Sequence, residues 1–385
     1  MITTINNKHK KLNVPNKREQ NQTCLDSAER EGLRPKGNVP NLRFPEFQGE
    51  WEKCKFKDVC STSTGNKNTQ DKIDDGIYPF YVRSQTVERI NSWTFDGEAI
   101  LTAGDGVGVG KVFHHTYGKI GVHQRVYILS NFKCDANYLF HFFSSHFYNR
   151  VKRMSAKNSV DSVRKEMITE MPLYLPSKQE QAKIGVLLSL LDERIATQSK
   201  VIDKLQSLIK GIAHKISKQG KPNIRLSECL ECSSTTLQES DVAEVGAYPV
   251  YGANGIVGYL DTYSTTKEAI YIIKDGSGVG SVSYVKGKCS ATGTLNILQA
   301  KEGYSLRYLY FMLKVFNFEP YKTGMAIPHI YFKDYRKAKI YCPSYELQVK
   351  YTDLLFGIEQ KAITEQKILT NLYNQKQYLL RQMFI

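Results

Sequence analysis

The chain has 385 residues, which corresponds to about two or three domains of ordinary size. Lys and Arg number 53 and Asp and Glu 38, so the formal net charge at pH 7 is +15. A surplus of this size favours a polyanionic partner, nucleic acid first and an anionic membrane surface second. Hydrophobic residues make up 41% and charged residues 24%, which argues against a mostly disordered chain.

Several classes of protein are excluded at this stage. No apolar run approaches the ~18 residues of a membrane span, and the run from Ile184 to Leu191 is broken by Gly185 and Ser189. The N-terminus is polar and has no apolar core of the kind found in secretory signals. The eight cysteines are scattered, and the lone Cys229-x-x-Cys232 has no second ligand pair for zinc. We therefore expect a cytoplasmic protein with reduced cysteines, no metal site and no membrane partner.

An internal repeat organises the chain. Six short segments return in the same order about 170 positions later, the last two after a shift of three residues, and chance does not supply six such matches. The matched pairs are Tyr78–Tyr81 with Tyr248–Tyr251, Glu98–Ile100 with Glu268–Ile270, Asp105–Gly110 with Asp275–Gly280, Tyr138–Leu139 with Tyr308–Leu309, Pro176–Ser177 with Pro343–Ser344, and Gln181–Lys183 with Gln348–Lys350. The protein is predicted to be two copies of one unit, preceded by a polar tail.

The first part of each copy, about 41–176 and 221–343, has short runs of β-favouring residues separated by glycine turns. Examples of such strands are Ala99–Leu101, Arg125–Leu129 and Ala269–Ile273. Tyr138–Tyr148 and Leu306–Phe316 have helical periodicity. Each first part is therefore predicted to be a compact α/β domain of the mixed, α+β, kind.

The second part of each copy is predicted to be a long helix. Ser177-x-x-Glu180 is a capping box, in which the serine hydroxyl accepts from the N3 amide and the glutamate accepts from the serine amide. In the other copy Ser344 can cap, but Leu347 stands where the glutamate should be. Apolar residues then alternate at steps of four and three, which is a heptad seam. The seam positions are Ile184, Leu188, Leu191, Ile195, Gln198, Ile202, Leu205, Ile209 and Ile212 in the first copy, and Tyr351, Leu355, Ile358, Ala362, Glu365, Leu369, Leu372, Lys376 and Leu379 in the second.

Two helices with one narrow stripe each most simply pack against each other. Gln198 and Glu365 each stand at the middle of their seam, so an antiparallel pair would bring them face to face and let them fix the register. The alternative is that each is a tolerated polar residue in an imperfect seam. The 28 steps from Ile184 to Ile212 span about 42 Å. Because one turn of B-DNA is about 34–36 Å, two basic domains held at the ends of such a pair could contact two half-sites on one duplex.

No catalytic constellation is found. Gly104–Lys111 fails the Walker A spacing and the G-x-G-x-x-G spacing, and Asp275–Gly280 fails as well, so both are interpreted as glycine-rich strand–turn elements. The Glu-x-Lys pairs at Glu359 and Glu365 lie on the second long helix, where solvated charges are expected. His114 and His115 have no partner set at metal-ligand spacing.

The candidate DNA contacts are basic and polar residues near the glycine-rich segments, where the two copies differ most. Lys and Arg neutralise phosphates, and Gln or Asn can pair with adenine in the major groove. For any single residue the alternative is a solvated surface side chain. The candidates are Lys111, His114, His115, Lys119, His123, Gln124, Arg125, Lys157, Asn158 and Arg164 in the first copy, and Lys274, Tyr284, Lys286, Thr292, Thr294, Lys322, Thr323 and His329 in the second.

The chain resembles the specificity subunit of Type I restriction–modification enzymes over about residues 38–385. The motifs that carry the resemblance are Asn38–Pro45 with Phe47, Gly49, Glu50 and Trp51 at the entry of the first domain, then Leu175–Ile184 leading into Leu191–Ile195. The resemblance implies target recognition domains over 38–176 and 218–343, a central helix over 177–217 and a C-terminal helix over 344–385. The polar, Asn/Lys-rich makeup of residues 1–37 favours a flexible arm, and the alternative is a segment that contacts DNA or a partner.

In that family the two domains bind the halves of a bipartite site, and the paired helices act as a spacer that docks two methyltransferase subunits. Restriction subunits join through the complex. The resemblance thus implies a non-catalytic chain that binds double-stranded DNA and holds no cofactor itself, while S-adenosylmethionine, ATP and Mg belong to its partner subunits. The alternatives are a self-contained DNA methyltransferase or nuclease, whose catalytic residues are not found, and a structural coiled-coil scaffold, which leaves the charge of +15 unexplained.

Overall fold

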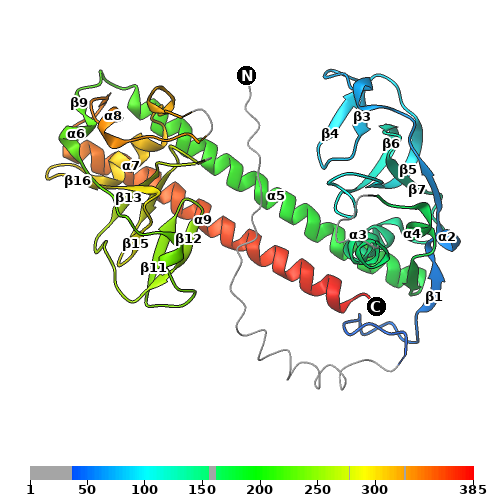
Figure 1. Cartoon of the computed structure of the whole chain (residues 1–385). Coiled ribbons are helices and arrows are strands. Elements are labelled where there is room, and N and C mark those ends of the chain that lie inside the picture. The colour runs from blue at the N-terminus through cyan, green and yellow to red at the C-terminus, as the bar shows by residue number, and fades with distance from the viewer. Residues whose placement is uncertain (1–36, 156–161, 277, 325–326) are drawn as a thin grey trace. The chain divides into compact units, whose positions relative to one another are not determined.

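The computed structural model describes residues 37–155, 162–276, 278–324 and 327–385 (Figure 1). The arm predicted over 1–37 therefore lies, except for Gly37, outside the described residues. The described chain divides into two compact units, one made of Gln198–Ile368 and one made of the residues up to Thr197 together with Leu369–Ile385. The division falls inside the two long helices rather than at their ends, because each helix half packs on its own globular part.

The first globular part has a six-stranded sheet with the strand order β2-β7-β5-β6-β3-β4, in which only β3 and β6 are parallel. A separate antiparallel pair, β1 with β8, joins the two ends of this part. The elements are β1 Glu52–Lys55, α2 Phe56–Val59, β2 Ser61–Thr64, η1 Thr69–Asp71, β3 Tyr78–Tyr81, β4 Val87–Ile90, β5 Phe95–Ala103, β6 Phe113–Val122, β7 Val126–Ser130, α3 Ala136–Met154, α4 Lys165–Thr169 and β8 Pro172–Leu175.

The central strand β5 is buried on both faces, which explains its continuous apolar run. Ile100 packs into the cluster that contains the buried side of α3, whereas Ala99 and Leu101 belong to a second cluster on the opposite face. Helix α3 begins where the Asp135 side chain accepts a hydrogen bond of 2.8 Å from the Tyr138 amide. The sheet is thus fixed against α3 on one side while its loops remain at the edge.

The second globular part repeats this topology, but the strand equivalent to β6 is interrupted. Its sheets have the orders β10-β16-β13-β14, β12-β11-β15 and β17-β9. β11 pairs in parallel with β15, as β3 does with β6, and Gly287 with a φ of 81° lies between β14 and β15. The elements are β9 Ile224–Arg225, α6 Leu226–Cys229, β10 Leu230–Ser233, η2 Glu239–Asp241, β11 Tyr248–Gly252, β12 Gly255–Leu260, β13 Ala269–Ile273, β14 Val282–Val285, β15 Ser290–Ala291, β16 Leu295–Ala300, α7 Leu306–Lys314, η3 Glu319–Tyr321, α8 Phe332–Tyr335 and β17 Lys339–Ile340.

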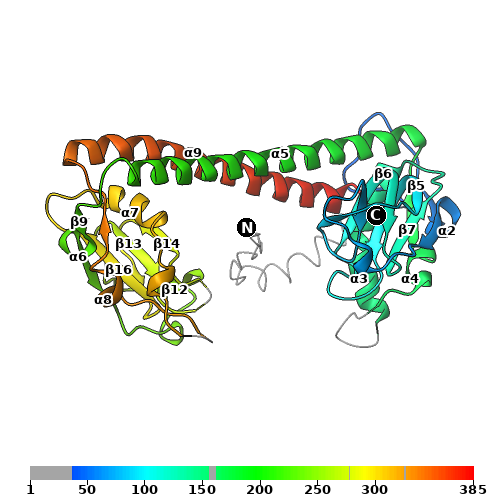
Figure 2. The same cartoon turned by 90° about the horizontal axis from the view of Figure 1, so that it is seen from above.

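The long helices are α5, Lys178–Ser217, and α9, Tyr345–Gln382. Within each unit their segments lie side by side and antiparallel (Figures 1 and 2). In one unit Gln198 binds Glu365 while Gln219 accepts from Tyr351, so the numbers rise along α5 as they fall along α9. Every predicted seam position is buried or half-buried, namely Ile184, Leu188, Leu191, Ile195, Gln198, Ile202, Leu205, Ile209, Ile212, Tyr351, Leu355, Ile358, Ala362, Glu365, Leu369, Leu372, Lys376 and Leu379.

Matched polar contacts join each long helix to its own globular part. Gln181 accepts from the amide of the cap residue Asp135 at 3.0 Å and donates to the Pro176 carbonyl at 2.8 Å. Gln348 makes the same two contacts, with Ser305 and with the carbonyl of the proline before α9, both at 2.9 Å. The repeat found in the sequence is therefore also a repeat of hydrogen bonds.

The capping box predicted at the start of α5 is only half present. The Ser177 hydroxyl accepts from the Glu180 amide at 3.3 Å, as the motif requires. The Glu180 carboxylate, however, binds the Arg43 guanidinium through two parallel hydrogen bonds of 2.7 and 2.8 Å, and not the Ser177 amide. The serine half of the prediction is confirmed, and the glutamate half was wrong because the guanidinium of a distant arginine, with two charged donors, outcompetes a backbone amide for a carboxylate.

Candidate nucleic-acid interface

The glycine-rich turns of the two copies are held by the same backbone frame. In each copy the turn that follows the central strand, β5 or β13, forms backbone hydrogen bonds with two other segments. One is the turn before β7 or β16, and the other is the segment before the short helix α4 or α8. The matched donors and acceptors are Gly104 N with Arg125 O (2.8 Å) and Lys274 N with Thr294 O (2.9 Å), then Val163 N with Gly104 O (2.7 Å) and Ile330 N with Lys274 O (2.9 Å). Three loops therefore meet at one place in each copy.

Positive φ angles explain why glycine recurs in these turns. Gly106 and Gly110 have φ of 76° and 64°, and Gly276 and Gly280 have 95° and 87°, values that other residues rarely adopt. The turn projects from the sheet, since Val107 at its tip is 98% exposed. These elements are the strand–turn structures that the sequence predicts.

In the first copy an ion-pair network surrounds the turn. Asp105 accepts a hydrogen bond of 2.8 Å from Arg83 Nη1, and its other oxygen lies 3.6 Å from Arg125 Nε. His123 is buried, and its Nδ1 accepts from the Arg125 amide at 3.0 Å. Burial and the nearby Arg83 charge lower the pKa of His123, so its ring is neutral and supports Arg125.

Other first-copy candidates lie near this network and are accessible. Gln124 is exposed and donates to Asn68 at 2.7 Å, and Lys111 is exposed on the glycine-rich turn. Arg164 is the exposed cap residue of α4. Lys157 and Asn158 lie outside the described residues.

Three predicted residues on β6 occupy different surroundings. His114 Nε2 lies 3.2 Å from the Ser84 carbonyl oxygen, and burial lowers its pKa. His115 stacks on Phe140 of α3, so it faces the helix rather than the loops. The Lys119 ammonium lies 5.1 Å from the ring centre of Trp93, at the β4–β5 turn.

In the second copy the equivalent turn carries different side chains. Asp275 faces His329, whose Nδ1 lies 3.9 Å from the carboxylate. His329 is held by backbone hydrogen bonds of 2.8 and 2.9 Å to Thr323. Thr292 and Thr294 bond to each other through their hydroxyls at 2.7 Å, and Thr292 is buried, so it acts as a support for its neighbour.

The remaining second-copy candidates are divided between the turn and a separate surface. Lys274 lies on the glycine-rich turn and is half-buried, while Lys322 pairs with Glu319 at 2.6 Å. Tyr284 donates to Glu268 at 2.5 Å, and Lys286 lies 4.8 Å from the ring centre of Phe356 on α9. Lys286 thus contacts the long helix, and Tyr284 packs on Tyr310 of α7, so the contacts of both residues lie outside the loop cluster.

The sequence interpretation missed Arg83 and Asp105 as members of the loop cluster. Asp105 was visible only as part of a failed nucleotide-binding motif, and nothing local links Arg83 to it across 22 positions. Within the ranges that the structure describes, no group of three or more His, Cys, Asp or Glu could hold a metal ion. In the same ranges no helix is both long and apolar enough to cross a membrane.

A family model described as the Type I restriction modification DNA specificity domain matches the chain twice, over residues 48–207 and 222–374. The chain belongs to this family. The two matches agree with the two copies that the repeat and the hydrogen-bonded frames define. The family is described by DNA specificity, which agrees with the prediction that this chain is not the catalytic subunit.

The chain is similar to known specificity subunits. It is 26% identical over 161 residues to the EcoDI specificity subunit of Escherichia coli, and the aligned segment covers 42% of this chain and 35% of that protein. It is 29% identical over 120 residues to the EcoprrI specificity subunit of Escherichia coli, and this segment covers 31% of this chain and 30% of that protein. The chain thus aligns with about a third of the length of these two relatives. The crystal structure of an S subunit from M. genitalium shares the fold, with a TM-score of 0.68 and 19% identity, over 90% of this chain and 99% of that one.

Proposed function

We propose that the chain is the DNA sequence-recognition subunit of a Type I restriction–modification complex, in which each copy binds one half of a bipartite target. The observation that carries this proposal is the pair of matched loop clusters, which have the same backbone frame and different side chains. A shared frame places each cluster in the same way on DNA, whereas different side chains select different bases. The charge of +15 fits a duplex as the partner.

Further proposals concern the partners of the helices. We propose that α5 and α9 dock two methyltransferase subunits, through which restriction subunits join. Apolar side chains on their outer surfaces support docking, since Val186 and Leu190 are 53% and 59% exposed on α5 and Leu354 is 55% exposed on α9. S-adenosylmethionine, ATP and Mg are assigned to those partners, and the complex acts on DNA in the cytoplasm.

Long-read sequencing of methylated adenine tests the proposal. DNA from cells that carry the partner methyltransferase subunit is compared with and without this chain. We expect a bipartite motif with a fixed gap that is present only when the chain is present. Chain that is soluble and partner-bound without any new motif would contradict the proposal, and methylation without the partner subunit would contradict the non-catalytic role.

Salt dependence of DNA binding provides a second measurement. If several phosphates are contacted, the affinity of the assembled methyltransferase for its target falls steeply between about 50 and 200 mM salt. A coiled-coil scaffold that binds only proteins would show no such dependence. The assembled complex is the appropriate sample because DNA contacts can be shared with the partner subunits.

A further inference from the structure

An aspartate at the same position of both copies has entirely different partners. Asp105 follows Gly104, and Asp275 follows Lys274. Gly104 and Lys274 make the matched backbone hydrogen bonds described above, so the two aspartates occupy equivalent positions of the backbone. Asp105 faces Arg83 and Arg125, while Asp275 faces His329. One carboxylate at one place in the frame therefore orients two guanidinium groups in the first copy and an imidazole in the second.

Backbone contacts establish which residues correspond. In each copy the backbone amide of a residue in the turn before β7 or β16 donates to the last tyrosine of the Tyr-Pro-x-Tyr segment in β3 or β11. Each aspartate also forms an isolated β-bridge to the segment before the short helix α4 or α8. The matched contacts are His123 N to Tyr81 O (3.0 Å) with Thr292 N to Tyr251 O (2.8 Å), and the bridges Asp105–Ser162 and Asp275–His329. Arg83 then corresponds to Ala253, Ser162 to His329, and Arg125 to Thr294.

Arg125 has the geometry of a base-contacting side chain. Its side chain is 65% exposed, and its Nε is the nitrogen paired with Asp105, 3.6 Å from the carboxylate oxygen. Among the described residues no hydrogen bond from either terminal nitrogen of Arg125 is found. Arg83 differs, because it uses one of its terminal nitrogens to bind Asp105. The backbone of Arg125 is fixed as well, because its amide donates a hydrogen bond to His123 Nδ1 and its carbonyl oxygen accepts one from the Gly104 amide.

A guanidinium held through Nε presents two parallel donors, and this fork matches the O6 and N7 acceptors of guanine in the major groove. A solvated arginine that only neutralises phosphate needs no oriented carboxylate beside it. The same position in the second copy carries Thr294, which has no fork. The carboxylate beside Arg125 therefore favours a contact with a base over a contact that only neutralises phosphate.

We propose that Arg125, oriented by Asp105, is a specificity-determining residue that contacts a guanine in the half-site bound by the first copy. This inference rests on the proposed function and extends it to one residue and one base. Arg83, Ser162 and Arg125, with their counterparts Ala253, His329 and Thr294, are then the positions at which the two copies diverge in specificity. Asp105 is a positioning residue, since it acts through Arg125.

The test uses the assembled methyltransferase and a set of duplexes in which each base pair of the established target is replaced in turn. Initial methylation rates are measured for the wild-type chain and for Arg125→Thr, which introduces the residue of the second copy. With the wild type we expect replacement of one G·C pair in one half-site to lower the rate about 10- to 100-fold. With Arg125→Thr this penalty disappears at that pair alone, while penalties at other positions are retained.

Two further variants separate base contact from charge and from folding. Arg125→Lys keeps the charge but not the fork, so the salt dependence of binding is retained while most of the penalty at that pair is lost. Arg153→Thr, an exposed arginine on α3 with no carboxylate partner among the described residues, should retain every penalty. Rate ratios within one preparation do not depend on the folded fraction.

Two results would overturn the inference. If Arg125→Thr retained all penalties, the residue would not contact a base. If it lowered the rate equally on every duplex, Arg125 would be a phosphate contact. A wild-type complex that shows no preference among the duplexes would instead refute the proposed function itself, so the two failures are distinguishable.

Discussion

Gln198 Nε2 donates a hydrogen bond of 3.1 Å to the backbone carbonyl oxygen of Glu365, and it also binds the carboxylate of Glu365. These two residues stand at the middle of their nine-position seams, and the register of the stripes predicts that they meet. The carboxylate also pairs with Lys361, and Lys361 together with Gln198 holds the pKa of Glu365 below its usual value. Glu365 is therefore a charged group in a mostly apolar seam.

We expect Gln198→Leu alone to lower the melting temperature, because the Glu365 carboxylate then faces an apolar side chain. Replacing both residues by leucine should restore or raise the melting temperature, since well-packed apolar pairs replace polar ones at no cost. Register would then be less tightly specified. Spin labels at the exposed positions Lys204 and Gln360 should show a broader distance distribution in the double variant, and an unchanged distribution would refute the register role.

The sequence predicts the elements whose cause is local or repeated. The heptad stripes, the serine cap and the glycine turns depend on residues a few positions apart, and the two copies confirm each other. Contacts between distant segments could be predicted only where a repeated stripe sets the register, as for Gln198 and Glu365. The partner of Glu180 is 137 positions away, and the carboxylate that orients Arg125 stands 20 positions before it. Side chains that share no local pattern are brought together by the tertiary fold.

The ion pair between Arg43 and Glu180 gives a prediction about stability. Glu180 is fully buried and Arg43 is 14% exposed, so water does not replace either partner. Arg43→Ala should destabilise the protein by about 3–5 kcal/mol, because it leaves a buried carboxylate without its cation. Urea unfolding followed by circular dichroism measures this loss.

The second copy provides the control for this ion pair. Leu347 occupies the position equivalent to Glu180, so the first turn of the helix accepts a leucine, although Leu347 is 40% exposed where Glu180 is buried. Arg43→Met combined with Glu180→Leu should therefore unfold at a urea concentration much closer to that of the wild type than Arg43→Ala alone does. Equal losses in both variants would mean that arginine packing, and not the charge pair, provides the stability.

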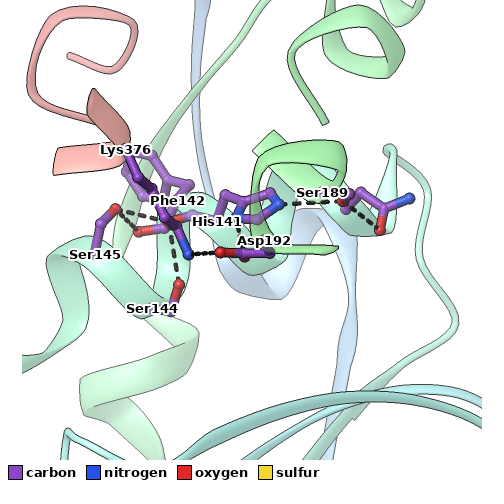
Figure 3. Close-up of polar contacts among 8 residues, drawn as sticks. His141, Phe142, Ser144, Ser145, Ser189, Asp192 and Lys376 are labelled. Atoms are coloured by element: carbon purple, nitrogen blue, oxygen red, sulfur yellow. Dashed lines mark hydrogen bonds and ion pairs between the residues drawn. The ribbon is translucent and has the colours of Figure 1, made fainter. Parts of the chain in front are cut away.

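His141 of α3 gives a prediction about pH dependence for the unit that contains the first globular part (Figure 3). Its Nε2 contacts the Ser189 hydroxyl at 3.2 Å, and its Nδ1 is buried without a hydrogen bond, 3.8 Å from Asp192. Lys376 pairs with Asp192 and offsets its charge. Burial, with smaller contributions from Lys376 and His115, lowers the pKa of His141 to about 3.

Because this pKa lies below the unfolded value of about 6.5, the folded state binds fewer protons in that range. Stability therefore falls as the pH drops from about 6.5 towards 3, and the loss at pH 5 is about 2 kcal/mol. The equivalent residue of the second copy is Phe311, which is fully buried. His141→Phe should remove this part of the pH dependence in urea unfolding between pH 7 and 5, and an unchanged slope would mean that the pKa of His141 is the same in the folded and unfolded states.

Exchange of one domain tests whether the two copies contribute independently to the target. Residues 41–176 contain the whole loop cluster of the first copy, and its contacts with the rest of the unit are made through the ends of α5 and α9. Replacing this segment with that of another family member should change one half of the methylated motif and leave the other half and the gap unchanged. Because the second cluster keeps its own frame, a change in both halves of the motif would mean that the copies do not recognise their half-sites separately.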